Sequence, residues 1–225
     1  MTRLAVPSTV AEFAAASGPN QTSSDVAFSP AVKALQSRLG SRRGYARMEQ
    51  SGGWETEVNP ELADFIGELD SFFLATASKD GQPYLQHRGG PKGFLKVLDS
   101  RTLAFADFGG NRQYISVGNL SENPRVQLFL MDWARRGRVK IWGEARVVEA
   151  TGPGRDPALL AKLRDPGYTA GKVERAIVIT VTAWDGNCPQ HISRRFSEEE
   201  VRALLEERDG KIARLEAEAA RLRKV

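Results

Sequence analysis

Cationic and amide side chains gather beside glycines at two places in the sequence. Arg88 and Lys92 lie in the stretch HRGGPKG, and Asn111, Arg112 and Gln113 follow a pair of glycines at the predicted start of a helix. A helix N-terminus offers unpaired backbone N–H groups and partial positive charge, and glycines let a ligand approach the backbone closely. Arginine adds a planar fork that matches phosphate oxygens. These residues therefore predict a phosphate-binding site.

The alternative for each cation is a solvated position on the surface, where most arginines lie. That interpretation is the better one for Arg88 or Arg112 taken alone, but their clustering at two turns favours a shared anion site. With 32 Lys and Arg against 28 Asp and Glu, the net charge is only +4. The expected anion is therefore a small molecule, and no nucleic-acid partner is expected.

Other catalytic signatures are missing from the sequence. It contains no Gly-x-Gly-x-x-Gly, no Gly-x-Ser-x-Gly and no His-Glu-x-x-His motif, and residues 167–172 fall short of a P-loop. A three-ligand zinc site of the usual kind would use both histidines and the one cysteine, so no metal site is expected. The cysteine, Cys188, has no identified base beside it and is interpreted as an inert buried thiol.

The composition predicts a globular chain with no membrane partner. Apolar residues make up 41 % and charged residues 27 % of the 225 positions, and no run of eighteen apolar residues occurs. The N-terminal segment is interrupted by Pro7 and Glu12 before it could form the apolar core of a signal peptide. We therefore expect a cytoplasmic protein.

The elements that must position these residues are mostly β-strands. The turn pair Asp80-Gly81 between two strand patterns is the strongest hairpin signal, and Asp99-Ser100-Arg101 is a loop short enough to require antiparallel pairing. Strand patterns cover residues 72–78, 83–90, 93–98, 102–108, 125–131, 138–150 and 175–184. With one helix inserted at 111–120, they predict a mainly β fold, a small six-stranded antiparallel barrel with helices at its rim.

Helices are expected outside the strand region. Short ones are predicted at 31–39, 59–69 and 157–163. We divide the chain into an N-terminal extension (1–60), a barrel domain (61–196) and a C-terminal amphipathic helix (197–225).

The C-terminal helix begins with a capping box at Ser197 and carries an apolar stripe that includes Ile212, Leu215 and Leu222. We expect Gly210 to interrupt this helix, and the stripe to pack on the barrel or on a partner subunit.

The order of residues from 72 to 148 resembles the pyridoxamine 5′-phosphate oxidase superfamily of FMN-binding split barrels. The resemblance is carried by TASKDGQPYLQHRGGPKGF, FADFGGNRQYISVGNLSENPRVQLFLMD and RRGRVKIWGEARVV. The later NCPQH segment at 187–191 is similar to that of a bacterial branch described only as related to these oxidases. The resemblance implies a six-stranded split barrel, a homodimer and one FMN in each of two clefts between the subunits.

Site residues carry over by position. Arg88 matches the arginine that lies along the FMN, and Lys92 falls one residue short of the family's lysine. Asn111 and Arg112 match the basic pair that holds the FMN phosphate. Arg138 occupies the place of a glutamine that faces the flavin, where it would stabilise the anionic reduced ring; the alternative for Arg138 is an exposed cross-strand cation.

The resemblance implies an FMN-dependent oxidoreductase that transfers hydride between a reduced nicotinamide or small organic substrate and FMN. The oxidases' substrate-phosphate group is not recognisable, and their terminal Arg-Leu-His-Asp-Arg segment is replaced by residues 190–195, so a strict pyridoxamine-phosphate oxidase is not expected. His191 is a candidate to protonate or orient the substrate, with a structural histidine as the alternative. The other functional hypotheses are a non-catalytic flavin carrier and a haem-binding barrel that uses His191 as ligand.

Overall fold

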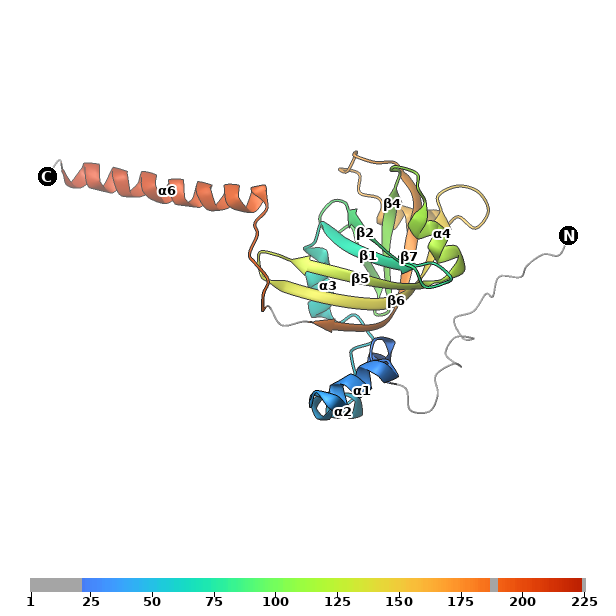
Figure 1. Ribbon diagram of the computed structural model, residues 1–225. Helices are drawn as coiled ribbons and strands as arrows, with labels where there is room; N and C mark the ends of the chain where they lie inside the picture. The colour runs from blue at the N-terminus through green and yellow to red at the C-terminus, as the bar shows by residue number, and fades with distance from the viewer. Residues whose placement is uncertain (1–21, 187–189, 224–225) are drawn as a thin grey trace.

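The computed structural model describes residues 22–186 and 190–223, and its centre is a seven-stranded antiparallel sheet (Figure 1). The order across the sheet is β2-β1-β5-β6-β7-β4-β3. The strands are β1 Ser71–Ala77, β2 Pro83–Gly89, β3 Lys96–Asp99, β4 Thr102–Phe108, β5 Arg125–Asp132, β6 Gly137–Glu149 and β7 Val173–Gly186. The antiparallel, β-rich fold is confirmed, whereas the predicted count of six strands is wrong.

Each of the seven segments with a strand pattern overlaps one observed strand, so the error lies in the count of six and not in the placement of the strands. β3 has four residues and is hydrogen-bonded to β4 alone, with a register shift between Val97 and Asp99. It forms the edge of the sheet as a strand of its own, which makes seven.

The sheet is strongly curled, so that strands far apart in its order face each other across the core. The ring of Phe72 on β1 lies 5.2 Å from the ring of Phe105 on β4, although three strands separate β1 from β4 in the sheet. Phe94 stacks on Phe72 at 5.5 Å. The curled sheet encloses a core whose fully buried side chains include Leu74, Leu103, Leu128, Ile141 and Ile177.

Three helices confirm the sequence prediction: α1 (Pro30–Arg38), α3 (Pro60–Gly67) and α5 (Pro157–Leu163). Each has proline in its first turn, and the side chain of the residue before it accepts a hydrogen bond from a backbone N–H. Helix α2 (Arg42–Gln50) is not predicted, because it buries no side chain and so shows no apolar stripe. The inserted helix, α4 (Ile115–Glu122), begins four residues later than predicted.

The cap of α3 provides a direct stability test. Asn59 Oδ1 accepts a hydrogen bond of 2.8 Å from the Leu62 N–H. We expect Asn59→Ala to lower the free energy of unfolding by about 1 kcal/mol, because that N–H would lose its partner. Ser41→Ala is the matched control, since Ser41 precedes α2 without a side-chain capping bond. Urea unfolding should show a loss for Asn59→Ala alone; equal losses would contradict the assignment of the cap.

The segment that includes α1 and α2 is fastened to the sheet by aromatic contacts. Trp54 stacks on Trp142 of β6 at 4.8 Å, and the Lys140 ammonium lies over both rings. Trp184 of β7 donates its indole N–H to the Glu57 carbonyl at 2.8 Å. These contacts seat the described part of the N-terminal region beneath the sheet (Figure 1).

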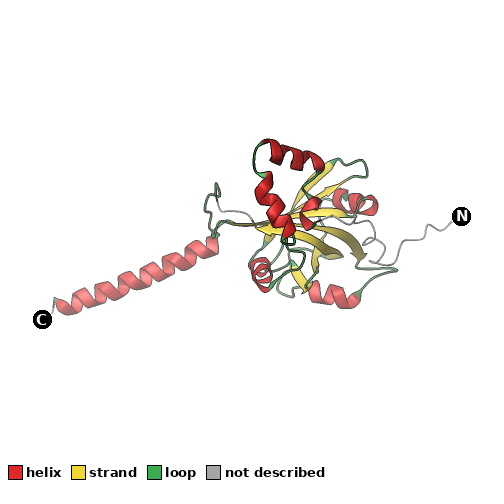
Figure 2. Cartoon of the chain, turned by 90° about the horizontal axis from the view of Figure 1, so that it is seen from below, coloured by secondary structure: helices red, strands yellow, loops and turns green. Residues whose placement is uncertain are grey.

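Helix α6 (Glu198–Leu222) projects away from the rest of the chain (Figure 2). It begins with the predicted capping box, in which Ser197 and Glu200 bond each other's backbone N–H groups. The expected interruption at Gly210 is wrong: one exposed glycine costs a helix about 1 kcal/mol, too little to break 25 residues. The helix buries no side chain, so its stripe does not pack on the sheet of its own chain. None of the described helices is long and apolar enough to cross a membrane.

Candidate functional site

A polar pocket of about 230 Å³ opens where the end of β2 meets β4, the start of β7 and the loop before α4. Three arginines and two carboxylates line it, which leaves one positive charge in excess. The lining residues that the following paragraphs use are Gln86, Arg88, Asp107, Asn111, Arg112, Gln113, Tyr114, Ser116, Glu174 and Arg175.

Asp107 holds two arginines in the wall of this pocket. Arg88 Nη1 on β2 lies 2.5 Å from Asp107 Oδ1, and Arg175 Nη1 on β7 lies 3.0 Å from Asp107 Oδ2. The exposed fractions of the three side chains are 13, 12 and 5 % for Arg88, Arg175 and Asp107. Asp107 and Arg175 are direct partners in the β4–β7 register, whereas Arg88 reaches Asp107 because the sheet curls. One carboxylate thus fixes two guanidinium groups.

The loop before α4 supplies the more exposed side of the pocket. Arg112 and Tyr114 both have positive φ values, 61° and 54°, and the Gln113 N–H donates to Asn111 Oδ1 at 3.2 Å. These left-handed positions prevent a helix from starting at Asn111, which explains the late start of α4. Asn111, Arg112 and Gln113 therefore lie in a turn and not in the first turn of a helix, so the predicted helix N-terminal cradle is corrected to a loop.

Arg112 and Arg175 of the pocket remain charged. The hydrogen bond from Arg112 Nε to the Tyr114 hydroxyl, 3.1 Å, raises the pKa of the Arg112 guanidinium. Burial lowers the pKa of Arg175, but its hydrogen bond to Asp107 and the nearby charges of Glu149 and Glu174 outweigh that effect and raise it overall. Both groups are thus cationic at every ordinary pH and can bind an anion without taking up a proton.

Two side-chain hydrogen bonds fix α4 against the sheet. Ser116 Oγ lies 3.0 Å from Gln86 Oε1 on β2, and Asn119 Nδ2 donates to Thr76 Oγ1 on β1 at 3.0 Å. Because α4 directly follows the loop, these bonds set the position of Arg112 relative to β2. The loop is therefore held by folded elements on both sides.

The structure brings four of the predicted binding residues together: Arg88, Asn111, Arg112 and Gln113 all line the pocket. Lys92 lies outside it and pairs with Glu68 at 2.8 Å on the surface. Arg138 is half-buried on β6, opposite Met131 of β5, and does not line this pocket. Within one chain, the predicted set is therefore divided among the pocket, the turn that carries Lys92 and strand β6 with Arg138.

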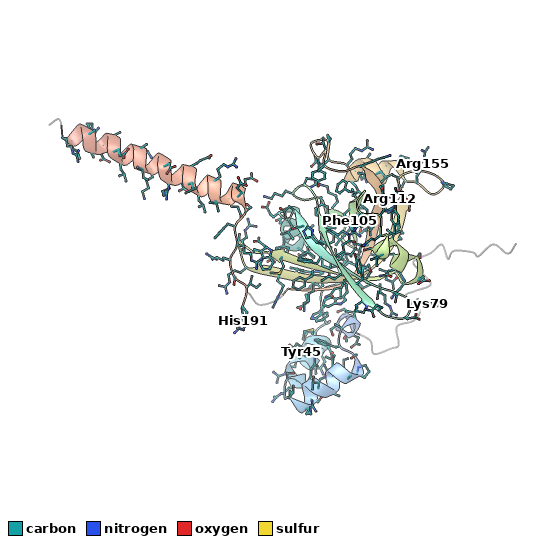
Figure 3. The ribbon with its side chains drawn as sticks, turned by 45° about the horizontal axis from the view of Figure 1, so that its top comes forward. Tyr45, Lys79, Phe105, Arg112, Arg155 and His191 are labelled. Carbon is teal, nitrogen blue, oxygen red and sulfur yellow. The ribbon has the colours of Figure 1, made fainter. Side chains whose placement is uncertain are left out.

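His191 lies far from this pocket. It is exposed, it has a φ of 65°, and Figure 3 shows it and Arg112 on opposite sides of the molecule. A role for His191 at this site would require a second subunit. Cys188 lies outside the described residues. In the part of the chain that the structure describes, no group of three or more His, Cys, Asp or Glu residues could hold a metal ion.

Sequence reasoning missed Asp107, Arg175 and Glu174. Each is a charged residue near the end of an apolar strand, and that position is the only signal the sequence offered. The contacts depend on the β4–β7 register and on the curl of the sheet, which join residues 19 and 68 positions apart. Glu174 lies close to Gly109: a Cβ there would be 3.0 Å from the Glu174 carboxylate, which would have to shift.

Comparison with known proteins gives one family match. The model of the pyridoxamine 5′-phosphate oxidase family matches residues 58–188. No curated protein matches the sequence.

Several solved structures resemble the chain. HupZ of Group A Streptococcus is 16 % identical, with 62 % of this chain and 99 % of that chain covered and a TM-score of 0.45. An FMN-binding protein of Syntrophomonas wolfei is 14 % identical, with 69 % and 97 % covered and a TM-score of 0.44. General stress protein 26 of Bacillus anthracis is 15 % identical, with 56 % and 91 % covered and a TM-score of 0.41.

Proposed function

This chain belongs to the pyridoxamine 5′-phosphate oxidase family, and on that premise we propose that it is an FMN-binding oxidoreductase whose polar pocket holds the FMN phosphate. The observation that carries the proposal is the exposed, cationic Arg112 at a pocket backed by Arg88 and Arg175. A phosphate monoester carries up to two negative charges, and an arginine guanidinium can bind two of its oxygens at once in a bidentate contact. The excess positive charge of the lining suits such a ligand.

The groups in the pocket have distinct tasks in this proposal. Arg112 and the amides of Asn111 and Gln113 would bind the phosphate oxygens. Arg88, fixed by Asp107 and lying over the Phe105 ring at 5.8 Å, would hold the inner side of the ligand. Glu174 would keep Arg175 oriented, since Arg175 Nη2 lies 3.3 Å from its carboxylate.

The pocket in one chain accounts for only part of a flavin site. Its volume of about 230 Å³ is below the roughly 300–1,000 Å³ of pockets that enclose a drug-sized ligand. We propose that a second subunit completes the site and that the curled seven-stranded sheet is a split barrel. Arg138 and Lys92 would then contact the flavin near the subunit boundary, and His191 of the opposite chain would approach the substrate.

FMN, when bound, supplies a ring that accepts and returns a hydride, and the chain contributes binding, orientation and charge. The expected substrate is a reduced nicotinamide or a small organic molecule. The protein is expected to act in the cytoplasm as a homodimer. A carrier that holds FMN without turnover is the alternative.

Reduction of the flavin distinguishes an oxidoreductase from a carrier. Protein loaded with FMN would be mixed in a stopped-flow instrument with NADH, NADPH or a reduced deazaflavin, and the loss of flavin absorbance followed. We expect the rate of flavin reduction to saturate as the concentration of one of these donors increases. A rate that rises linearly with the concentration of every donor, as for free FMN, would support the carrier and contradict turnover.

A further inference from the structure

Helix α6 carries a heptad pattern of apolar residues on one exposed face. Leu205, Ile212 and Ala219 occupy a positions and Val201, Leu215 and Leu222 occupy d positions, and the two polar members are Glu198 at a, in the first turn, and Arg208 at d. The six large apolar side chains of α6 are 41–65 % exposed. Spacings of three and four residues that alternate over the whole helix are typical of a two-stranded coiled coil.

This face has no partner in the described part of its own chain. α6 stands clear of the sheet in two perpendicular views (Figures 1 and 2), and it buries no side chain. In folded proteins most of the stability of a helix comes from packing of its apolar face, and this face has no such packing within its own chain. A second copy of the same helix offers the same pattern of knobs and holes.

The charges that flank the apolar face favour a second copy in parallel orientation. In a parallel pair, each g position faces the e position five residues later on the other helix. Lys211 at g then faces Glu216 at e, and Glu218 at g faces Arg223 at e. Both pairs are attractive, and each forms twice in a symmetric dimer.

An antiparallel pair is less favourable. With the helix ends level, Lys211 would face Lys211 and Asp209 would face Asp209, and the Arg202–Glu216 pairs offset this repulsion only in part. In the parallel pair Arg208 at d meets Arg208 of the other helix, and Asp209 at the neighbouring e position of each helix offsets this repulsion.

We propose that α6 forms a parallel two-stranded coiled coil with α6 of a second copy of this chain. Three and a half heptads bind weakly on their own, but two chains already joined elsewhere hold the helices at high effective concentration. The coiled coil stabilises a homodimer and requires no bound flavin.

Disulfide trapping tests the orientation in the full chain. In a Cys188→Ser background, Val201→Cys and Leu222→Cys place thiols at d positions near opposite ends of the helix, and Ala203→Cys and Ala217→Cys place them at outward f positions as matched controls. Mild oxidation should yield covalent dimers from both d variants and few from the f variants. Parallel pairing is contradicted if neither d variant is trapped, or if the f variants are trapped equally well.

A charge swap tests the pairing independently. Lys211→Glu should raise the dimer dissociation constant on the order of tenfold, because two attractive pairs become repulsive. The double variant Lys211→Glu/Glu216→Lys should restore it. Sedimentation equilibrium would measure both, with FMN affinity as an independent readout that distinguishes failure of this proposal from failure of the flavin site. No effect of the single variant, or no restoration by the double, would overturn the pairing.

Discussion

Replacing Asp107 with asparagine should lower the free energy of unfolding by about 3–5 kcal/mol, the largest effect expected from a single polar substitution in this chain. Asp107 is 5 % exposed and is the shared partner of Arg88 and Arg175. Asparagine keeps the shape of the side chain but removes the charge. Two guanidinium groups would then lie close together in a poorly solvated site with no anion between them.

Chemical unfolding in urea measures this loss. The matched control is Glu68→Gln, which removes the carboxylate from an ion pair with Lys92 whose side chains are 46 and 62 % exposed. An ion pair this exposed contributes little to stability because water and salt screen it, so the control should be close to wild type. If Asp107→Asn behaves like the control, the ion pairs of Asp107 with Arg88 and Arg175 do not stabilise the fold. Added phosphate should recover part of the loss, because an anion can replace the missing charge.

Replacing Arg112 with alanine should weaken FMN binding by about 1.5–3 kcal/mol, the range for a hydrogen bond to a charged group. That corresponds to roughly tenfold to a hundredfold in the dissociation constant. Riboflavin lacks the phosphate, so its affinity should stay nearly unchanged. Quenching of flavin fluorescence on titration would give both constants.

The comparison of the two ligands separates phosphate contact from damage to the fold. Arg155→Ala is a suitable control, because Arg155 is an exposed arginine on a different loop that does not line the pocket (Figure 3). It should change neither affinity. Equal losses of FMN and riboflavin affinity in Arg112→Ala would show that Arg112 does not contact the phosphate.

Much of the fold could be predicted because it depends on local chemistry. The Asp80-Gly81 turn joins β1 and β2 as expected, and Gly81 has the positive φ, 87°, that favours glycine. Asn59 and Ser197 cap helices where the sequence placed them. These signals act over three or four residues and need no knowledge of the tertiary structure.

The errors arise where a local preference competes with another effect. Residues 111–114 have helix-compatible composition, but the Asn111 side chain caps the Gln113 amide and two residues adopt positive φ, which delays α4. The expected interruption at Gly210 does not occur, because the cost of one glycine is small in a capped helix of 25 residues.

The site was predictable in part. Arg88 and Arg112 were found because each lies beside glycines at a turn. The ion pairs that join Arg88 to Asp107 and Asp107 to Arg175 could not be predicted. They depend on the strand register and on the curl of the sheet, which bring together residues that are distant in sequence. Lys92 and Arg138 match the family by position but lie outside the pocket of one chain, so their predicted roles depend on the second subunit.

The most direct test of the flavin site is sedimentation velocity of the full-length protein mixed with FMN, recorded at both the protein and the flavin absorbance bands. The predicted result is one boundary near twice 24.7 kDa, with one FMN per chain moving with the protein. A boundary without flavin absorbance would contradict FMN binding. A monomer that carries tightly bound flavin would contradict a site completed by the second subunit.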